Sequence, residues 1–425
     1  MFSYCSVKNK KGPKHRLVTS RRWRFTAAAN SLAGMRTHTL AGPAALALAL
    51  CLGASNAAAD AYQTVNAGLA AFQAGNTDKA LALLSDAINS HDLSGAILAT
   101  AYYDRGGLYL SRNDLEKALA DADKAIALSP GYGEALKMRG TIHFARGDMD
   151  AAIADLHAAQ QILPDDDGIH VDLGNALRSK GDSAKAIAEY DSAIAMRPTP
   201  LAFAARALAR LAAGQNDAAV ADFGEAIRLK PDYAPAYLNR ANAYAASGKF
   251  DLAIADFDRA LKLRPDDPNA LSGRANALAK LGHADQAATE YDAMLHANPG
   301  DALLHRKRGD VYLAARDYDK AIADYDAALT LAPGDAGVLL NRGAAYHSKG
   351  NYARAIDDYT AALKTTPNDA RLYNNRGNAY AAMSKFDQAI ADYDAALRIQ
   401  PGYADALHNR EGAMKAKTTG KTVHG

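Results

Sequence analysis

Cysteine is nearly absent from this sequence: Cys5 and Cys51 are the only two, and both precede residue 60, as does the single tryptophan, Trp23. Residues 60–425 therefore offer no disulfide, no thiol nucleophile and no cysteine-based metal site. The sequence also has no HExxH segment and no histidine pair at zinc-ligand spacing beside an acid. We accordingly expect no catalytic residue, no metal ion and no cofactor.

Acidic residues are missing from the N-terminal segment. Residues 1–59 hold nine of the 49 Lys and Arg and none of the 47 Asp and Glu, so residues 60–425 carry a net charge of −7. A mildly acidic body argues against nucleic-acid binding through phosphate neutralisation. The formal charge of +2 for the whole chain hides this division.

No apolar run in the N-terminal segment is long enough to span a membrane. The run at 40–53, LAGPAALALALCLG, falls short of the roughly 20 residues that a spanning helix needs. It follows the basic Arg36 and precedes small residues, the order of a secretory signal peptide. We expect export, periplasmic or extracellular, with cleavage near Ala57 or Ala59 and no stable membrane span in the mature protein.

The segment 1–34 admits more than one interpretation. Met35 is a second possible start, which would make 1–34 a translated upstream region. Because the segment is rich in arginine and free of acids, a mitochondrial transit peptide is the alternative. The compact apolar run favours export.

The rest of the chain is a repeat. The nonapeptide AIADYDAAL occurs at 321–329 and again at 389–397. Prolines mark the same period, with a step of 34 everywhere except for one step of 33: Pro130, Pro164, Pro198, Pro231, Pro265, Pro299, Pro333, Pro367 and Pro401. A fixed period in this range indicates a solenoid of one repeated supersecondary unit. Apolar spacings of three and four with a mid-unit glycine predict helix, turn, helix.

The invariant letters of the nonapeptide predict packing. In one unit Ala253, Phe257 and Ala260 are spaced by four and three residues, so they form one stripe of the second helix. The alanines allow helices to approach closely and the ring fills the space between neighbouring hairpins. Only stacked hairpins can bury such a stripe.

These features resemble the tetratricopeptide repeat (TPR) family, in its bacterial exported type, over residues 61–417. The resemblance implies an all-α, right-handed superhelical solenoid of about ten repeats with a C-terminal capping helix. We divide the chain into an extension with signal peptide (1–59), a degenerate first repeat (60–98), nine repeats (99–403) and a capping helix with a frayed tail (404–425).

Arginine and an acid recur at the same period. Arg240 and Arg342 belong to a series that lies nine residues after most of the prolines. An acid stands just before the second-helix ring position in eight units, as Asp256 does. Matched series of opposite charge suit pairing within or between hairpins, so we interpret them as scaffold. Exposed pairs of this kind contribute about 0.2–1 kcal/mol each.

Asparagine recurs in the first helices. In TPR proteins these positions line the concave groove that grips extended peptides, and an amide can donate to and accept from a peptide backbone at once. The predicted partner-binding residues, called the groove set below, are Asn175, Asn239, Asn242, Asn276, Arg306, Asn341, Arg371, Asn374, Asn375, Asn378 and Asn409.

One TPR subclass clamps acidic chaperone tails with two asparagines and three basic residues. Here Arg306, Asn341 and Arg371 fit that clamp, but Asp310 stands where asparagine is needed and Asn375 replaces a basic residue. An acid at position 310 would repel a terminal carboxylate, so we do not expect chaperone-tail binding.

The sequence thus predicts a non-catalytic scaffold that binds a peptide or helix of a protein partner in the cell envelope. No stretch is long enough for a catalytic domain outside the repeats. The alternatives are a self-associating structural protein and a helper subunit of a neighbouring enzyme or secretion complex. The identity of the partner, the process served and the oligomeric state stay open.

Overall fold

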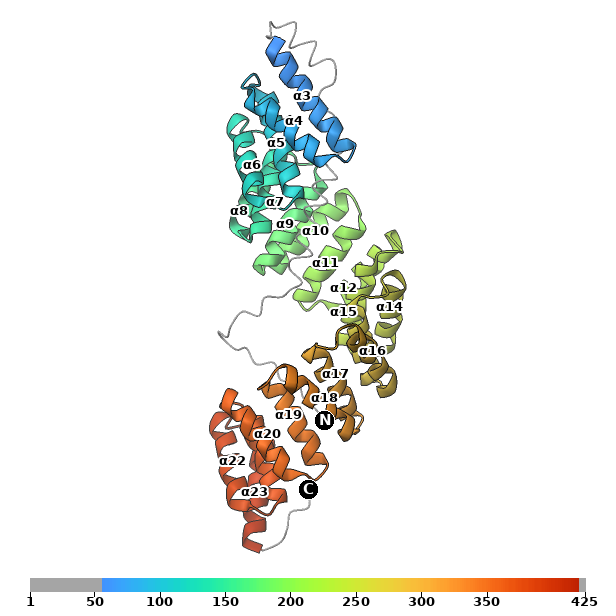
Figure 1. Cartoon of the computed structure of the whole chain (residues 1–425), viewed down its shortest axis with the longest axis vertical. Helices are drawn as coiled ribbons and strands as arrows, with labels where there is room; N and C mark the ends of the chain where they lie inside the picture. The colour runs from blue at the N-terminus through green and yellow to red at the C-terminus, as the bar shows by residue number, and fades with distance from the viewer. Residues whose placement is uncertain (1–55, 420–425) are drawn as a thin grey trace. The chain divides into compact units, whose positions relative to one another are not determined.

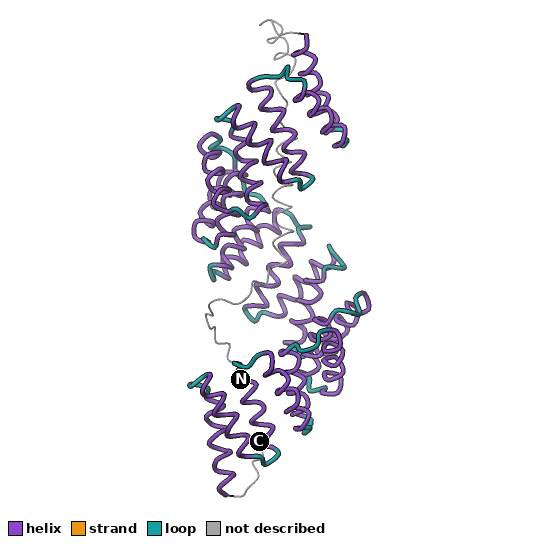
Figure 2. The backbone as a smooth tube through the Cα atoms, turned by 60° about the vertical axis from the view of Figure 1, so that its left-hand side comes forward, coloured by secondary structure: helices purple, strands orange, loops and turns teal. Residues whose placement is uncertain are grey.

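The computed structural model describes residues 56–419, and every regular element in that range is an α-helix (Figure 1). Short turns and loops join the helices, and no strand occurs among these residues (Figure 2). The predicted all-α repeat fold is confirmed. The expected signal-peptide run at 40–53 and the end of the frayed tail, 420–425, lie outside the described residues.

The chain divides into two compact units between Pro231 and Asp232. The helices of the first unit are α3 (Asn56–Gln73), α4 (Thr77–Asn89), α5 (Gly95–Ser111), α6 (Leu115–Leu128), α7 (Gly133–Arg146), α8 (Met149–Ile162), α9 (Asp167–Lys180), α10 (Ser183–Met196), α11 (Pro200–Ala212) and α12 (Asn216–Leu229). Those of the second are α13 (Ala234–Ala246), α14 (Phe250–Leu263), α15 (Pro268–Lys280), α16 (Ala284–Ala297), α17 (Ala302–Ala314), α18 (Tyr318–Leu331), α19 (Ala336–Ser348), α20 (Tyr352–Thr365), α21 (Ala370–Ala382), α22 (Phe386–Ile399) and α23 (Ala404–Thr419).

From residue 56 to residue 419, consecutive helices form ten hairpins, and α23 follows the last as a single helix packed on α22. We call the two members of each hairpin helix A and helix B. The predicted count of about ten repeats with a capping helix is confirmed. The A helices of neighbouring hairpins also contact each other: α17 contacts α19, and α7 contacts α9. The B helices of neighbouring hairpins make fewer contacts with each other. Within each unit the A helices therefore lie on the inner side of the stack.

The core consists mainly of rings and alanines on helix B. Ala253 and Phe257 are fully buried and Ala260 is 3% exposed, as the stripe predicts. The largest side chains with almost no exposure include seven rings at equivalent positions: Tyr190, Phe223, Phe257, Tyr291, Tyr325, Tyr359 and Tyr393. Each ring lies between helices that approach closely because their neighbours are small.

Glycine on helix A makes room for some of these rings. A Cβ atom placed on Gly343 would lie 2.6 Å from the Tyr359 ring, and one on Gly377 would lie 2.7 Å from the Tyr393 ring. Such distances are well inside van der Waals contact, so a larger side chain at these sites would push the ring out of its place.

Acidic side chains in the inter-hairpin turns begin the next helix A. The Asp335 carboxylate accepts hydrogen bonds from the Gly337 and Val338 amides at 2.8 and 3.1 Å. Asp301 and Asp267 cap α17 and α15 in the same way. These N-caps satisfy helix donors that would otherwise lack a partner, which gives much of the acidic composition a structural role.

Candidate functional site

The asparagines of the groove set occupy recurring places on helix A. Asn239, Asn341, Asn375 and Asn409 are separated by whole multiples of the repeat period, and three residues further on stand Asn242, Asn276 and Asn378, with Asn175 equivalent in the first unit. Residues three apart share a face of a helix. The set therefore forms a polar row on successive A helices of the second unit, with Asn175 alone on α9.

Three asparagines are bound to the ring of their own hairpin. The Tyr190 hydroxyl donates to Oδ1 of Asn175, Tyr291 to Asn276 and Tyr393 to Asn378, each at 2.8 Å. A buried tyrosine hydroxyl requires a partner, and the amide oxygen supplies it. These asparagines thus hold the core ring in place, a role that the sequence analysis does not predict.

Asp310 performs the same task as those asparagines. Its Oδ1 accepts from the Tyr325 hydroxyl and from Nδ2 of Asn341, both at 2.8 Å. Burial raises the pKa of Tyr325 above its ordinary value, and the charge and hydrogen bond of Asp310 raise it further. The acid that breaks the clamp pattern is therefore part of the packing between α17, α18 and α19.

Asn239 and Asn242 differ from the rest of the groove set. Among the described residues neither side chain makes a hydrogen bond, and Asn242 is exposed. The helix B ring of this hairpin is Phe257, which has no hydroxyl to donate to Asn242. Replacement of tyrosine by phenylalanine therefore leaves that amide available for a ligand.

The other members of the groove set are engaged with each other or with turn acids. Asn409 donates to Oδ1 of Asn374 at 3.0 Å, and Asn374, 4% exposed, donates to Asn375 at 3.4 Å. Arg371 pairs with Asp369 at 2.7 Å.

Arg306 is also held in place, though more loosely. It lies 3.7 Å from Asp335, and its Nε is buried without a hydrogen-bond partner. Both arginines of the groove set are thus directed to N-cap acids, Arg371 to Asp369 and Arg306 to Asp335.

The periodic arginines pair with helix B acids, as the sequence predicts. Arg342 donates through Nε and Nη2 to both oxygens of Asp358 at 2.9 and 2.6 Å, and through Nη1 to Asp326 of the preceding hairpin at 2.5 Å. The same two-pronged pairing recurs at Arg105–Asp121, Arg139–Asp155, Arg206–Asp222, Arg240–Asp256, Arg308–Asp324 and Arg376–Asp392.

Two features of these pairs differ from the expectation. The pairs are not exposed as expected, because the acids of the seven two-pronged pairs are all buried and Asp222 is only 3% exposed. Arg206 also belongs to the series, although it lies eight residues after Pro198 and not nine. The shortened repeat loses its one residue between Pro198 and helix A: α11 begins two residues after that proline, at Pro200, whereas α13 begins three residues after Pro231. The constant spacing of 16 between Arg206 and Asp222 would have revealed the pair.

Two helix A acids in the first unit escaped the sequence analysis. Burial raises the pKa of Asp104 to about 7 and that of Asp172 to about 6. The Oδ2 atom of Asp104 is buried without a hydrogen-bond partner. Both acids occupy the place that Asn239 and Asn341 occupy in the second unit. Two A helices of the first unit therefore carry an acid at a position where α13, α19 and α21 of the second unit carry an amide.

Within residues 56–419, no group of three or more His, Cys, Asp or Glu side chains is placed to hold a metal ion. In the same range, no helix is both long enough and apolar enough to cross a bilayer.

Comparison with known families identifies the repeat. Sequence models described as tetratricopeptide repeat or TPR repeat match residues 65–133, 103–167, 143–209, 207–248, 241–282, 272–336, 345–384 and 370–403. These matches cover most of the chain. The protein belongs to the tetratricopeptide-repeat family, whose members bind protein partners and are generally non-catalytic interaction modules.

Solved structures show similar helical repeats. A TPR protein from Parabacteroides merdae is 22% identical, covering 58% of this chain and 98% of its own, with a TM-score of 0.47. Yeast Tom70 is 15% identical over 85% of this chain and 96% of its own, with a TM-score of 0.43. The Cut9–Hcn1 structure of the APC/C is 16% identical over 93% of this chain and 96% of its own, with a TM-score of 0.44. These are likenesses of fold alone. No curated protein matches the sequence.

The Arg–Asp pairs generate a stability prediction. In Arg342→Ala, Asp358 would remain buried without its cation, so we expect the free energy of unfolding to fall by roughly 3 kcal/mol. Lys349→Ala, at the C-terminal end of the same helix, breaks the exposed pair with Asp319 and should cost at most about 1 kcal/mol. Urea unfolding followed by circular dichroism measures both. Equal losses in the two variants would show that the half-buried pairs contribute no more than surface pairs.

Asp104 generates a prediction on pH. Its pKa is about 7 in the folded chain, against about 3.9 when unfolded, so the folded state binds the proton more tightly. Stability should therefore fall as pH rises from about 4 to about 7. Asp104→Asn should raise the melting temperature at pH 8, and this gain should vanish toward pH 4.

Asp165→Asn, in an exposed turn, controls for the loss of one negative charge. If Asp104→Asn raised the melting temperature equally at pH 8 and pH 4, the raised pKa of Asp104 would be contradicted.

Proposed function

We propose that this protein is a non-catalytic scaffold that holds an extended peptide or a helix of a partner protein against the A helices of its second unit. The observation that carries the proposal is the pair of amides, Asn239 and Asn242, which have no partner of their own among the described residues. An exposed asparagine offers one acceptor and two donors, the complement of a peptide backbone.

The surrounding asparagines support this use of the surface. Asn276 and Asn378 give only Oδ1 to the core rings, so the described contacts leave their NH2 groups open to a ligand. The row therefore combines amides that are free with amides that are oriented by the core. Pre-oriented donors bind with a smaller loss of side-chain freedom.

Recognition of a backbone rather than of side chains would tolerate different partner sequences. The net charge of −7 on residues 60–425 favours a partner that is neutral or basic. In the first unit, Asp104 and Asp172 lie at the places equivalent to the asparagines and would favour a cationic group there.

The experiment compares baits of the full chain. Asn239→Ala/Asn242→Ala should lose the partners that the unaltered chain captures from an envelope extract, while Asn298→Ala, in an exposed inter-hairpin turn, should keep them. Mass spectrometry identifies the captured proteins. If the double variant retained every partner, binding would not use these amides. If only further copies of the chain were captured and sedimentation depended on concentration, self-association would replace the proposal.

We also propose that the protein is exported to the cell envelope. The support is the apolar run at 40–53, preceded by basic and followed by small residues. The expected mature N-terminus is Ala58 or Asp60, after cleavage at Ala57 or Ala59. Mass spectrometry of the protein recovered from the periplasm measures it, and a cytoplasmic chain retaining residues 40–53 would reject export.

A further inference from the structure

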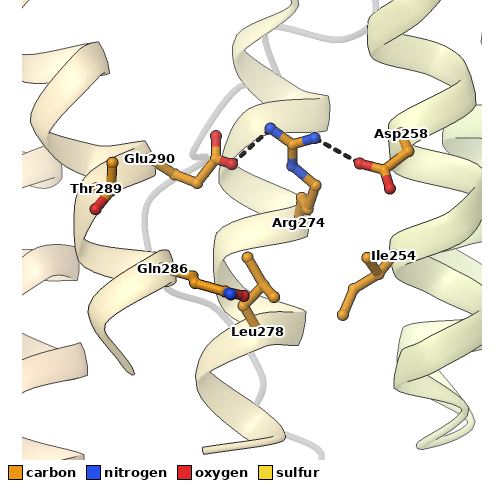
Figure 3. Close-up of a pocket in the computed structure, with 7 residues that line it drawn as sticks. All are labelled: Ile254, Asp258, Arg274, Leu278, Gln286, Thr289 and Glu290. Carbon is orange, nitrogen blue, oxygen red and sulfur yellow. Dashed lines mark hydrogen bonds and ion pairs between the residues drawn. The ribbon is translucent and has the colours of Figure 1, made fainter. Parts of the chain in front are cut away.

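A pocket of about 360 Å³ lies where α14, α15 and α16 meet in the second unit. Figure 3 shows Leu278 and Ile254 below and the Arg274 guanidinium above, bonded to Glu290 and Asp258 at 2.5 Å each. Gln286 and Thr289 complete the lining. We call this the α15 pocket. Its size is at the lower end of the range for small-molecule sites, which suits a single side chain.

In five other hairpins the equivalent residue of helix A is a tyrosine, and in three hairpins of the first unit it is His143, Leu177 or Arg210. Tyr346 stands two repeats after Leu278, and its ring lies between two cations, 6.0 Å from the Arg342 guanidinium and 5.7 Å from that of Arg354. In the first unit, Tyr109 lies in the same way between Arg105 at 5.9 Å and Lys117 at 5.2 Å.

The α15 pocket is lined by the counterparts of those two cations. Arg274 corresponds to Arg342, and Gln286 corresponds to Arg354, each two repeats earlier. The residue between them is Leu278, which is shorter than tyrosine and has no ring. The pocket is therefore the place that a tyrosine ring takes in the five hairpins that have a tyrosine at this position, bounded by the same positions.

Charge at the α15 pocket also departs from the siblings. Glu290 replaces the usual aspartate, and the two-pronged pairing is lost: Arg274 gives one bond to each acid, and its Nε is buried without a partner. Two carboxylates face one guanidinium, so the rim is net negative near neutral pH. Gln286 supplies no cation where Arg354 and Lys117 do.

We propose that the α15 pocket receives a tyrosine or phenylalanine side chain of a partner protein whose neighbouring lysine or arginine meets the negative rim. The ring would lie against Leu278 and Ile254 beneath the Arg274 guanidinium, as Tyr346 lies beside Arg342. Cation–π attraction and apolar burial favour the ring, and the acids favour the adjacent cation.

This site is separate from the asparagine row. Asn276 follows Arg274 by two residues, which places it about 200° around α15, on the other side of the helix. Binding at the α15 pocket and binding along the A helices can therefore be tested independently, and either proposal can fail without the other.

The test titrates the full chain with acetyl-Lys-Tyr-Lys-amide, observed by saturation-transfer NMR of the peptide. We expect binding at least tenfold tighter than for acetyl-Lys-Ala-Lys-amide and several-fold tighter than for acetyl-Glu-Tyr-Glu-amide. Leu278→Tyr restores the sibling residue and should weaken binding at least tenfold while leaving the helical spectrum intact. Leu278→Phe fills the pocket with a ring that has no hydroxyl, and it should weaken peptide binding as Leu278→Tyr does.

Leu281→Tyr is the matched control, because it adds the same ring at a partly exposed site just past the end of α15. It should bind as the unaltered chain does. The proposal is overturned if Leu278→Tyr binds equally well, or if the tyrosine peptide binds no tighter than the alanine or glutamate peptide. A dimer that Leu278→Tyr abolishes would also overturn it, since the occupant would then be a second copy.

Discussion

Burial of the helix B aromatic ring, present in seven of the ten hairpins of residues 56–419, is the constraint on which the rest of the structure depends. The ring of Tyr359 or Phe257 has almost no exposed surface, and neither helix of a hairpin could cover it alone. Alanines beside the ring on helix B, and Gly343 or Ala241 opposite on helix A, bring the helices close enough to enclose it. The asparagines that accept from tyrosine hydroxyls follow from the same requirement, since a buried hydroxyl needs an acceptor.

Ring burial and the proposed ligand binding would thus draw on the same amides. Where helix B carries tyrosine, as in Tyr291, the asparagine opposite is partly committed to the core. Where it carries Phe257, the amide of Asn242 is released. The presence or absence of one hydroxyl group on a core ring therefore decides whether the asparagine opposite is bound to that ring or left without a partner. The α15 pocket shows a related exchange, in which loss of a helix A tyrosine opens a place that a partner could fill.

The fold could be predicted almost entirely from the sequence, because the constant period and the Ala–ring–Ala stripe repeat a pattern that only stacked hairpins can bury. The Arg–acid pairing was predictable for the same reason, except at Arg206, where the deletion shifts the register. The candidate site was harder to predict from the sequence. Nothing in the spacing tells Asn242 from Asn276; the distinction depends on whether the ring of the following helix B has a hydroxyl. The raised pKa of Asp104 and the pocket beside Leu278 depend on three-dimensional burial, which the period does not encode.

The arginine pairs have a further consequence for how such a chain can change over evolutionary time. Arg342 bonds one acid in its own hairpin and one in the hairpin before, and Arg308 does the same with Asp324 and Asp292. Because these junctions use the same two bonds, excision or duplication of a whole repeat would rejoin matching partners. The array can therefore vary in length by recombination while each new junction is already complementary. The shortened repeat accommodates the deletion of a single residue in the linker ahead of helix A. There the deletion displaces no arginine or acid from its partner, and Arg206 still pairs with Asp222.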